Sequence, residues 1–192
     1  MTDTKIFNGL NTVQMTETVA AIKNQPQIGA FQFRAKNKWI DGGLNRSEIQ
    51  GFYGAGQEDT SRAKPFVYTN SEPPLLLGGN EAANAGEFLL HALAGCITTT
   101  FVLHATARGI RVDEVSTSLE GDVDLQGLLD LDKSVSPGFE AIRVKMNVKA
   151  DCSDEQLDEL LAFAGEHSPV TQTIRRPVPV RLERVTSKSE SA

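Results

Sequence analysis

The sequence has few of the residues that mark several classes of protein. Its 192 residues include only two cysteines, Cys96 and Cys152, too few for a disulfide scaffold and typical of a reducing compartment. There is no positive excess, because 19 basic against 25 acidic residues leave a net charge of −6, which disfavours nucleic-acid binding. The amino-terminal segment has no apolar core behind a basic region, so we expect no secretory signal and a cytoplasmic protein. Repeats and glycine-rich phosphate loops are also missing, whereas a 40% hydrophobic content suffices for one folded core.

One uncharged run, residues 88–107, is 20 residues long and could cross a bilayer. His91, His104, a run of three threonines and the lack of basic or aromatic flanking anchors instead favour the central helix of a folded core. We therefore expect no membrane association. Asn84 is a candidate helix N-cap with Glu87 completing a capping box, and Gly109 is a candidate helix stop.

Hydrophobic periodicity predicts the remaining elements. Alternation of apolar and polar residues predicts strands at 31–36, 47–53, 65–68, 115–125, 142–148 and 178–182. In the first of these, Phe31 and Phe33 are expected on the buried face. The acidic outer row of the fourth strand can pair with the basic outer row of the fifth. Helical spacing and capping residues predict helices at 12–24, after Ser153 and after Ser168.

The predicted element order indicates the fold class and the domain boundaries. Strands occur in groups rather than in alternating βαβ units, which predicts an α+β fold with a mainly antiparallel sheet. We expect residues 1–27 to form a helical extension, residues 28–185 the main domain and residues 186–192 a flexible tail.

Cys96 is the residue with the most informative position for chemistry. In the middle of an uncharged helix it is either a small buried hydrophobic residue or a nucleophile, and the second role needs a cation from another element or subunit. Cys152 lies between acidic residues, a setting unlike that of reactive cysteines. The cysteines and the three histidines have no metal-ligand spacing, so we expect neither a metal nor a cofactor.

The segment 86–96 (GEFLLHALAGC) and Ser168-Pro169-Val170 resemble the OsmC/Ohr family of peroxide-detoxifying proteins. The likeness continues through four blocks, which are Gly109-Ile110, Glu120-Gly121-Asp122, Pro137-Gly138-Phe139 and Pro177-Val178-Pro179-Val180. The resemblance implies an OsmC-like fold, with antiparallel sheets packed on long central helices in an intertwined homodimer. It also implies sites at the dimer interface that reduce organic hydroperoxides.

The resemblance assigns catalytic roles to three residues. Cys96 matches the peroxidatic cysteine, Arg46 the arginine that holds it as a thiolate, with Arg34 as the alternative, and Glu87 the glutamate near the start of the core helix. Ser168 stands where peroxidase members have their resolving cysteine, and a hydroxyl cannot form a disulfide. The implied reductant is therefore an external thiol, either a dihydrolipoyl protein or a small-molecule thiol.

Three hypotheses about function remain open. The chain is a one-cysteine hydroperoxide reductase, a non-catalytic dimer that binds an apolar small molecule in its interface pocket, or a different enzyme on the same fold. The first two differ in the ionisation of Cys96, because attack on a peroxide needs a thiolate.

Overall fold

The computed structural model describes residues 5–176 and 178–185. The helices are α1 (Thr12–Asn24), α2 (Ala85–Ala107), α3 (Leu125–Leu128), α4 (Asp154–His167) and α5 (Pro169–Arg175), with short 3₁₀ turns η1 (Pro26–Gly29) and η2 (Pro74–Leu76). The strands are β1 (Ile6–Phe7), β2 (Leu10–Asn11), β3 (Lys36–Asp41), β4 (Leu44–Ile49), β5 (Phe52–Gly54), β6 (Gln57–Asp59), β7 (Phe66–Asn70), β8 (Val112–Asp122) and β9 (Ala141–Ala150). Every pairing between these strands is antiparallel, so the α+β prediction is confirmed.

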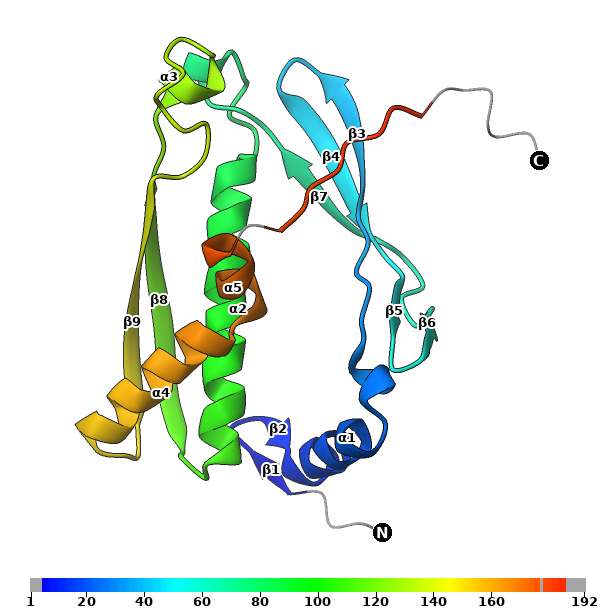
Figure 1. Ribbon diagram of the computed structural model, residues 1–192, viewed down its shortest axis with the longest axis vertical. Coiled ribbons are helices and arrows are strands. Elements are labelled where there is room, and N and C mark those ends of the chain that lie inside the picture. The colour runs from blue at the N-terminus through cyan, green and yellow to red at the C-terminus, as the bar shows by residue number, and fades with distance from the viewer. Residues whose placement is uncertain (1–4, 177, 186–192) are drawn as a thin grey trace, which may run out of the picture.

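The carboxy-terminal half is built around α2 (Figure 1). Both sides of its predicted capping box form, since Asn84 Oδ1 accepts a hydrogen bond from Glu87 N and Glu87 Oε2 accepts one from Asn84 N, each at 2.8 Å. The helix ends before Gly109, whose φ of +70° suits glycine. The side chains of Phe101 and Leu160 are fully buried where α2 meets α4, and they form the core with Ala105, Ile110 and Ala164.

The long hairpin β8–β9 covers one side of α2. Its register places Glu120 opposite Arg143, and the Arg143 guanidinium contacts both Glu120 and Asp122. The predicted pairing of an acidic row with a basic row is therefore confirmed, although β8 ends at Asp122 and Leu125 begins α3. Ser153 and Ser168 cap α4 and α5 as predicted.

The amino-terminal half differs from the prediction in its strands. The predicted strand at 47–53 divides into β4 and β5, and regular pairing begins at Lys36, leaving only a Gln32–Tyr53 bridge in the predicted strand at 31–36. Phe31 and Phe33 stack on each other and on Phe52, but Phe33 is 74% exposed. The prediction of a buried face was wrong for the single chain, because the contacts with Phe52 of β5 leave both rings more than half exposed.

The predicted closing strand at 178–182 is also wrong for the single chain. Residues 178–185 pair with no described strand, and Val180 and Leu182 are 81% and 96% exposed. The alternating pattern is that of a strand, but no described strand of the same chain pairs with it, and Pro179 has no N–H to donate. The predicted tail at 186–192 lies outside the described residues.

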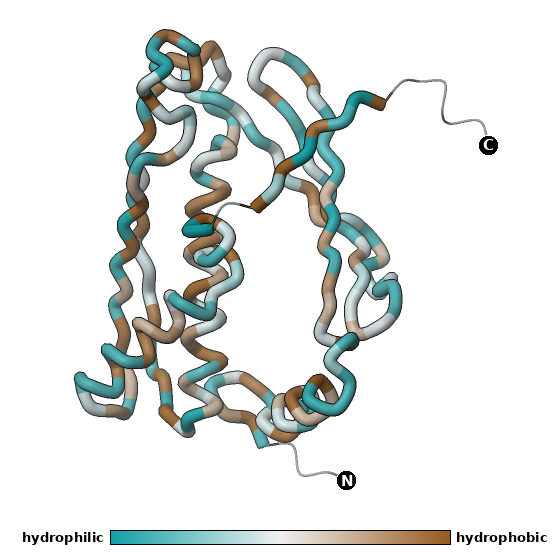
Figure 2. The backbone as a smooth tube through the Cα atoms, in the orientation of Figure 1, coloured by the Kyte–Doolittle hydropathy of each residue, from teal (hydrophilic) through white to brown (hydrophobic). Residues whose placement is uncertain are grey.

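The two halves of the subunit stand apart in space. Figure 1 shows the sheet β3–β4–β7 diverging from α2. The two are connected at one end through the loop 71–84, where Tyr68 of β7 contacts Phe88 of α2 edge-on, and at the other end through α1 and β1–β2. Figure 2 shows that α2 is hydrophobic along most of its length. The exposed surface of 14527 Å² is far larger than the roughly 8,900 Å² expected of a compact monomer of this mass. One subunit alone therefore leaves large apolar faces uncovered.

Candidate functional site

Cys96 lies on the open side of α2. Its thiol is free and half-buried. Leu89 and Leu103 are seven residues before and after it, so all three lie on nearly one line along the helix, and the two leucines are 37% and 43% exposed. The core side of the helix is formed instead by Leu93, Ile97 and Phe101. Cys96 therefore belongs to an uncharged stripe that faces away from its own subunit's core.

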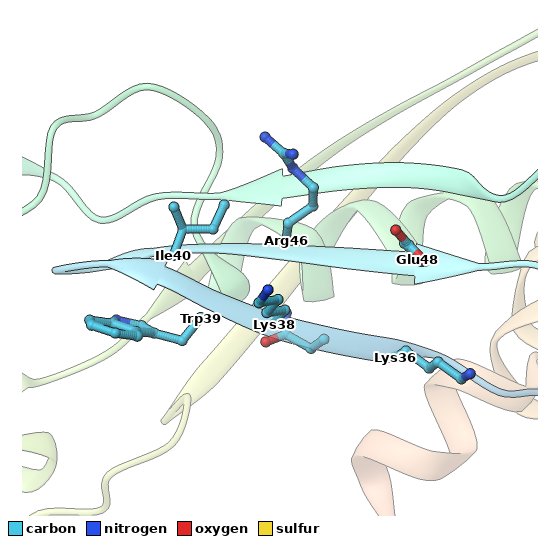
Figure 3. Close-up of a pocket in the computed structure, with 7 residues that line it drawn as sticks. Lys36, Lys38, Trp39, Ile40, Arg46 and Glu48 are labelled. Atoms are coloured by element: carbon cyan, nitrogen blue, oxygen red, sulfur yellow. The ribbon is translucent and has the colours of Figure 1, made fainter.

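Arg46 lies in the other half of the subunit, on β4. It faces Lys38 directly across the β3–β4 pair, a like-charge contact, while Lys36 faces Glu48. Figure 3 shows these side chains around a groove of about 760 Å³ that Trp39 and Ile40 also line. Cys96 does not line this groove, and none of the described ion pairs includes Arg46. Arg46 is thus a cation with no carboxylate partner from its own sheet.

Arg34, the alternative to Arg46, is already neutralised. Its two terminal nitrogens donate to the two carboxylate oxygens of Glu58 at 2.8 and 2.7 Å, and its guanidinium also donates to Gln32. The hydrogen bond from Arg34 lowers the pKa of Glu58, which keeps the pair charged. Arg34 is therefore a weak candidate for activating a thiol.

Glu87 is held at the start of α2 by its capping role. It precedes Cys96 by nine residues, which corresponds to about 13.5 Å along the helix and half a turn around it. The two side chains therefore lie on opposite faces of α2. Among the described residues, no contact within one subunit joins Cys96, Arg46 and Glu87.

Ser168 lies at the junction of α4 and α5 and is fully buried. Its Oγ accepts a hydrogen bond from Thr171 N at 3.3 Å, and its own N–H donates to Ala164 O at 2.9 Å. Because α5 packs against α2, this helix junction faces the helix that carries Cys96. The serine there serves as a cap.

An apolar cavity of about 350 Å³ lies between α2, β9 and α5, and no pattern in the sequence predicted it. Its walls are formed by Leu93, Ile97, Phe139, Glu140, Ala141, Ile142, Val144, Thr171, Ile174 and Arg175. Thr171 Oγ1 is buried and makes no hydrogen bond among the described residues. An unpaired buried hydroxyl costs stability.

A second cluster that the sequence did not reveal lies at the carboxyl ends of α2 and α4. Phe163 stacks on His167 with ring centroids 3.7 Å apart, contacts His104 edge-on, and lies under the Arg108 guanidinium. Burial, together with the charges of Arg108 and His167, lowers the pKa of His104. Helical spacing alone could not show that residues of two helices meet here.

Two further properties of the described residues bear on function. Histidine, cysteine and acidic side chains form no group of three that could hold a metal ion in this part of the chain. By length and composition alone, α2 could cross a membrane, a test that the core helix of a folded protein also passes.

Comparison with known proteins identifies the fold and the family. The family model for OsmC-like proteins matches residues 78–183. An OsmC-like protein from Mycoplasma pneumoniae superposes with a TM-score of 0.59 at 15% identity, covering 75% of this chain and 87% of the other. An organic hydroperoxide resistance protein from Legionella pneumophila gives 0.53 at 17% identity, covering 74% and 90%. A search of curated protein sequences gave no significant match. Since the family model covers more than half of the chain, this protein belongs to the OsmC-like family.

Proposed function

We propose that this protein reduces organic hydroperoxides through Cys96, with an external thiol as reductant. The observation that carries the proposal is the placement of Cys96, a free and half-buried thiol on the uncharged outer stripe of the central helix. Solved structures of the same fold include proteins described as organic hydroperoxide resistance proteins. The apolar surroundings suit the organic group of such a substrate better than hydrogen peroxide.

The chemistry needs two steps and a reductant. In the first, the Cys96 thiolate attacks one peroxide oxygen, the O–O bond breaks, and the alcohol leaves with a proton, so that the sulfur becomes a sulfenic acid. In the second, one external thiol displaces water to form a mixed disulfide, and another thiol releases Cys96 as a disulfide forms between the two reductant sulfurs. Ser168 cannot supply the second sulfur, which is why the reductant is external.

The cation that this mechanism requires comes, in our proposal, from Arg46 in a homodimer. Arg46 has no described carboxylate partner, and it lies on a sheet that its own α2 does not cover. A second copy that fills the space beside this sheet would bring its Cys96 stripe toward Arg46. Glu87 caps its helix and lies on the face of α2 opposite Cys96, so we assign it no contact with the thiol or with the arginine. We place the protein in the cytoplasm, where such thiols stay reduced.

The decisive experiment follows the reaction of the reduced protein with cumene hydroperoxide by stopped flow and intact mass. Cys96→Ser should abolish the rapid oxidation. Cys152→Ser is the matched control, because Cys152 is half-buried against the core near β9 and should not react. If wild type oxidises no faster than a free thiol in solution, the proposed activity is wrong.

A second candidate function, non-catalytic binding of an apolar molecule, is favoured by the cavity beside α5. Its mainly apolar walls suit a small apolar ligand. Titration with the fluorescent probe anilinonaphthalene sulfonate tests this function. Val144→Phe, on the inward face of β9, should fill the cavity and remove the probe signal, whereas an unchanged signal would place the probe elsewhere.

A further inference from the structure

Residues 5–29 lie outside the region matched by the family model and form a module of their own, made of β1, β2, α1 and η1. We propose that this module is a clasp that closes each subunit around a second copy of the chain, so that two subunits separate only after the clasp opens. The inference rests on the homodimer proposed above, and it goes beyond it by assigning a role to the extension.

One end of the module is fastened to the carboxyl end of α2. Asn8, at the tip of the β1–β2 hairpin, donates from Nδ2 to Thr106 Oγ1 at 3.1 Å and to Ile110 O at 2.8 Å. Its Oδ1 accepts from Val112 N at 3.0 Å. All of its amide's bonds therefore go to the turn between α2 and β8, around 100 residues away in sequence. The tip has a left-handed backbone, with a φ of +48° at Asn8 and +77° at Gly9.

The other end of the module is fastened to the amino-terminal half. Ile22 of α1 packs against Gly29 of η1, which leads directly to Phe31. The ring of Phe31 lies over Gly54, where there is no room for a Cβ, and Gln32 exchanges two backbone hydrogen bonds with Tyr53 at 2.9 and 3.0 Å. The module thus spans from α2 to the hairpin β5–β6, as Figure 1 shows.

These two attachments close the subunit into a frame. The loop 71–84 joins the two halves at one end of Figure 1, and the module joins them at the other. The Cys96 stripe of α2 faces outward from its own core, and residues such as Phe33 and Phe66 are more than half exposed on the amino-terminal half. A molecule that lies between the two halves is therefore enclosed by the loop 71–84 at one end and by the clasp at the other.

The occupant that fits this frame is a second copy of the chain. The surface in excess of a compact monomer is roughly 5,600 Å² per chain, more than enough for an obligate homodimer, whose interface buries about 2,000–5,000 Å² over both partners. A second copy offers an uncharged α2 stripe to cover the one exposed here, in a two-fold arrangement. No residue of α1 is buried within one subunit, and Val19 and Ile22 are 48% and 37% exposed, so α1 has an apolar side left for the same partner.

Subunit exchange tests the clasp directly. Isotopically labelled and unlabelled protein are mixed, and native mass spectrometry follows the mixed dimer. Asn8→Gly removes all three side-chain hydrogen bonds while keeping the left-handed turn that glycine adopts freely. Asn80→Gly is the matched control, because Asn80 also has positive φ, +52°, is exposed, and makes no side-chain hydrogen bond among the described residues.

We expect Asn8→Gly to exchange subunits about tenfold faster or more than wild type, and Asn80→Gly to exchange at the wild-type rate. Equal rates for Asn8→Gly and wild type would overturn the clasp while leaving the dimer and its activity intact. A wild-type protein that is monomeric would overturn the clasp together with the homodimer. The peroxide reaction of Cys96, measured separately, shows whether the proposed chemistry survives either result.

Discussion

At the scale of single residues, the structure separates groups that the family resemblance brings together. Cys96 lies on the outer stripe of α2, whereas Glu87 belongs to the cap of the same helix. Arg46 lies on β4, in the other half of the chain. Arg46 has no described ion-pair partner, whereas Arg34 is held by Glu58. This difference is why we propose Arg46, and not Arg34, as the cation beside the thiolate, because the bound carboxylate offsets the charge of a paired guanidinium.

The two arginines give a paired prediction. We expect Arg46→Ala to slow the oxidation of Cys96 by cumene hydroperoxide by about tenfold or more, since an activating charge is lost. Arg34→Ala should leave the rate within about twofold and leave stability nearly unchanged, because its exposed ion pair contributes little. If Cys96 were oxidised slowly in Arg34→Ala and at the wild-type rate in Arg46→Ala, Arg34 would be the activating cation instead. Stopped-flow kinetics measures both.

His104 predicts a pH dependence of stability. Its pKa is lowered in the folded protein, chiefly by burial. As the pH falls below about 6.5, the unfolded chain therefore takes up a proton before the folded state does. The free energy of unfolding decreases over this range, until the folded state also binds the proton. Between about pH 7.5 and about pH 5.5, wild type should lose more stability in urea than His104→Gln.

His91, which is exposed on the same helix, provides the control for this measurement. His91→Gln should show the full wild-type loss. Equal losses in wild type and His104→Gln would mean that His104 contributes nothing to the acid sensitivity.

At the scale of helices and strands, elements with a local signal were predicted well and those completed by other parts of the molecule were not. The capping residues Asn84, Ser153 and Ser168 mark helix starts because a cap is satisfied within a few residues. The hairpin β8–β9 follows from its alternating pattern and complementary charges. The segment 178–182 has the same alternation, but a strand also needs a neighbouring edge, which one subunit does not provide.

The packing of α2 on α4 leads to a prediction at this scale. Leu160 is 1% exposed and contacts the core at this helix crossing. Leu160→Ala should lower the free energy of unfolding by about 2–5 kcal/mol through lost burial and a cavity. The neighbouring exposed substitution Glu159→Ala should change it by no more than about 0.5 kcal/mol. Urea denaturation measures the free energy of unfolding of both variants. Equally small changes in the two would mean that the crossing of α2 and α4 is not the core.

At the scale of the whole molecule, the subunit is an open frame rather than a compact body. Its surface, 14527 Å², includes exposed leucines on α2 and exposed rings on the amino-terminal half. Such faces are stable in water only when another molecule covers them. The homodimer we propose accounts for the uncovered helix stripe and the unpaired carboxy-terminal segment at once.

A concentration dependence of stability follows from this assembly. In an obligate dimer, folding and association are linked, so the thermal midpoint should rise by several degrees over a ~100-fold increase in protein concentration. Light scattering should give twice the chain mass of 20.8 kDa. Leu103→Glu should lower the midpoint by placing a charge on the α2 stripe, while Leu128→Glu, on α3, should not. A midpoint that does not move with concentration would contradict the dimer.

By itself, the sequence determined the features that depend on neighbours in the chain: the helix caps, the amphipathic strands, the uncharged central helix and the position of Cys96 on it. Tertiary structure alone decided which residues meet across long separations. It placed Asn8 against the α2–β8 turn, His104 against Phe163, and a cavity between α2, β9 and α5. The physical reason is that caps and alternation are satisfied locally, whereas contacts between distant segments depend on how whole elements pack, which no short pattern records.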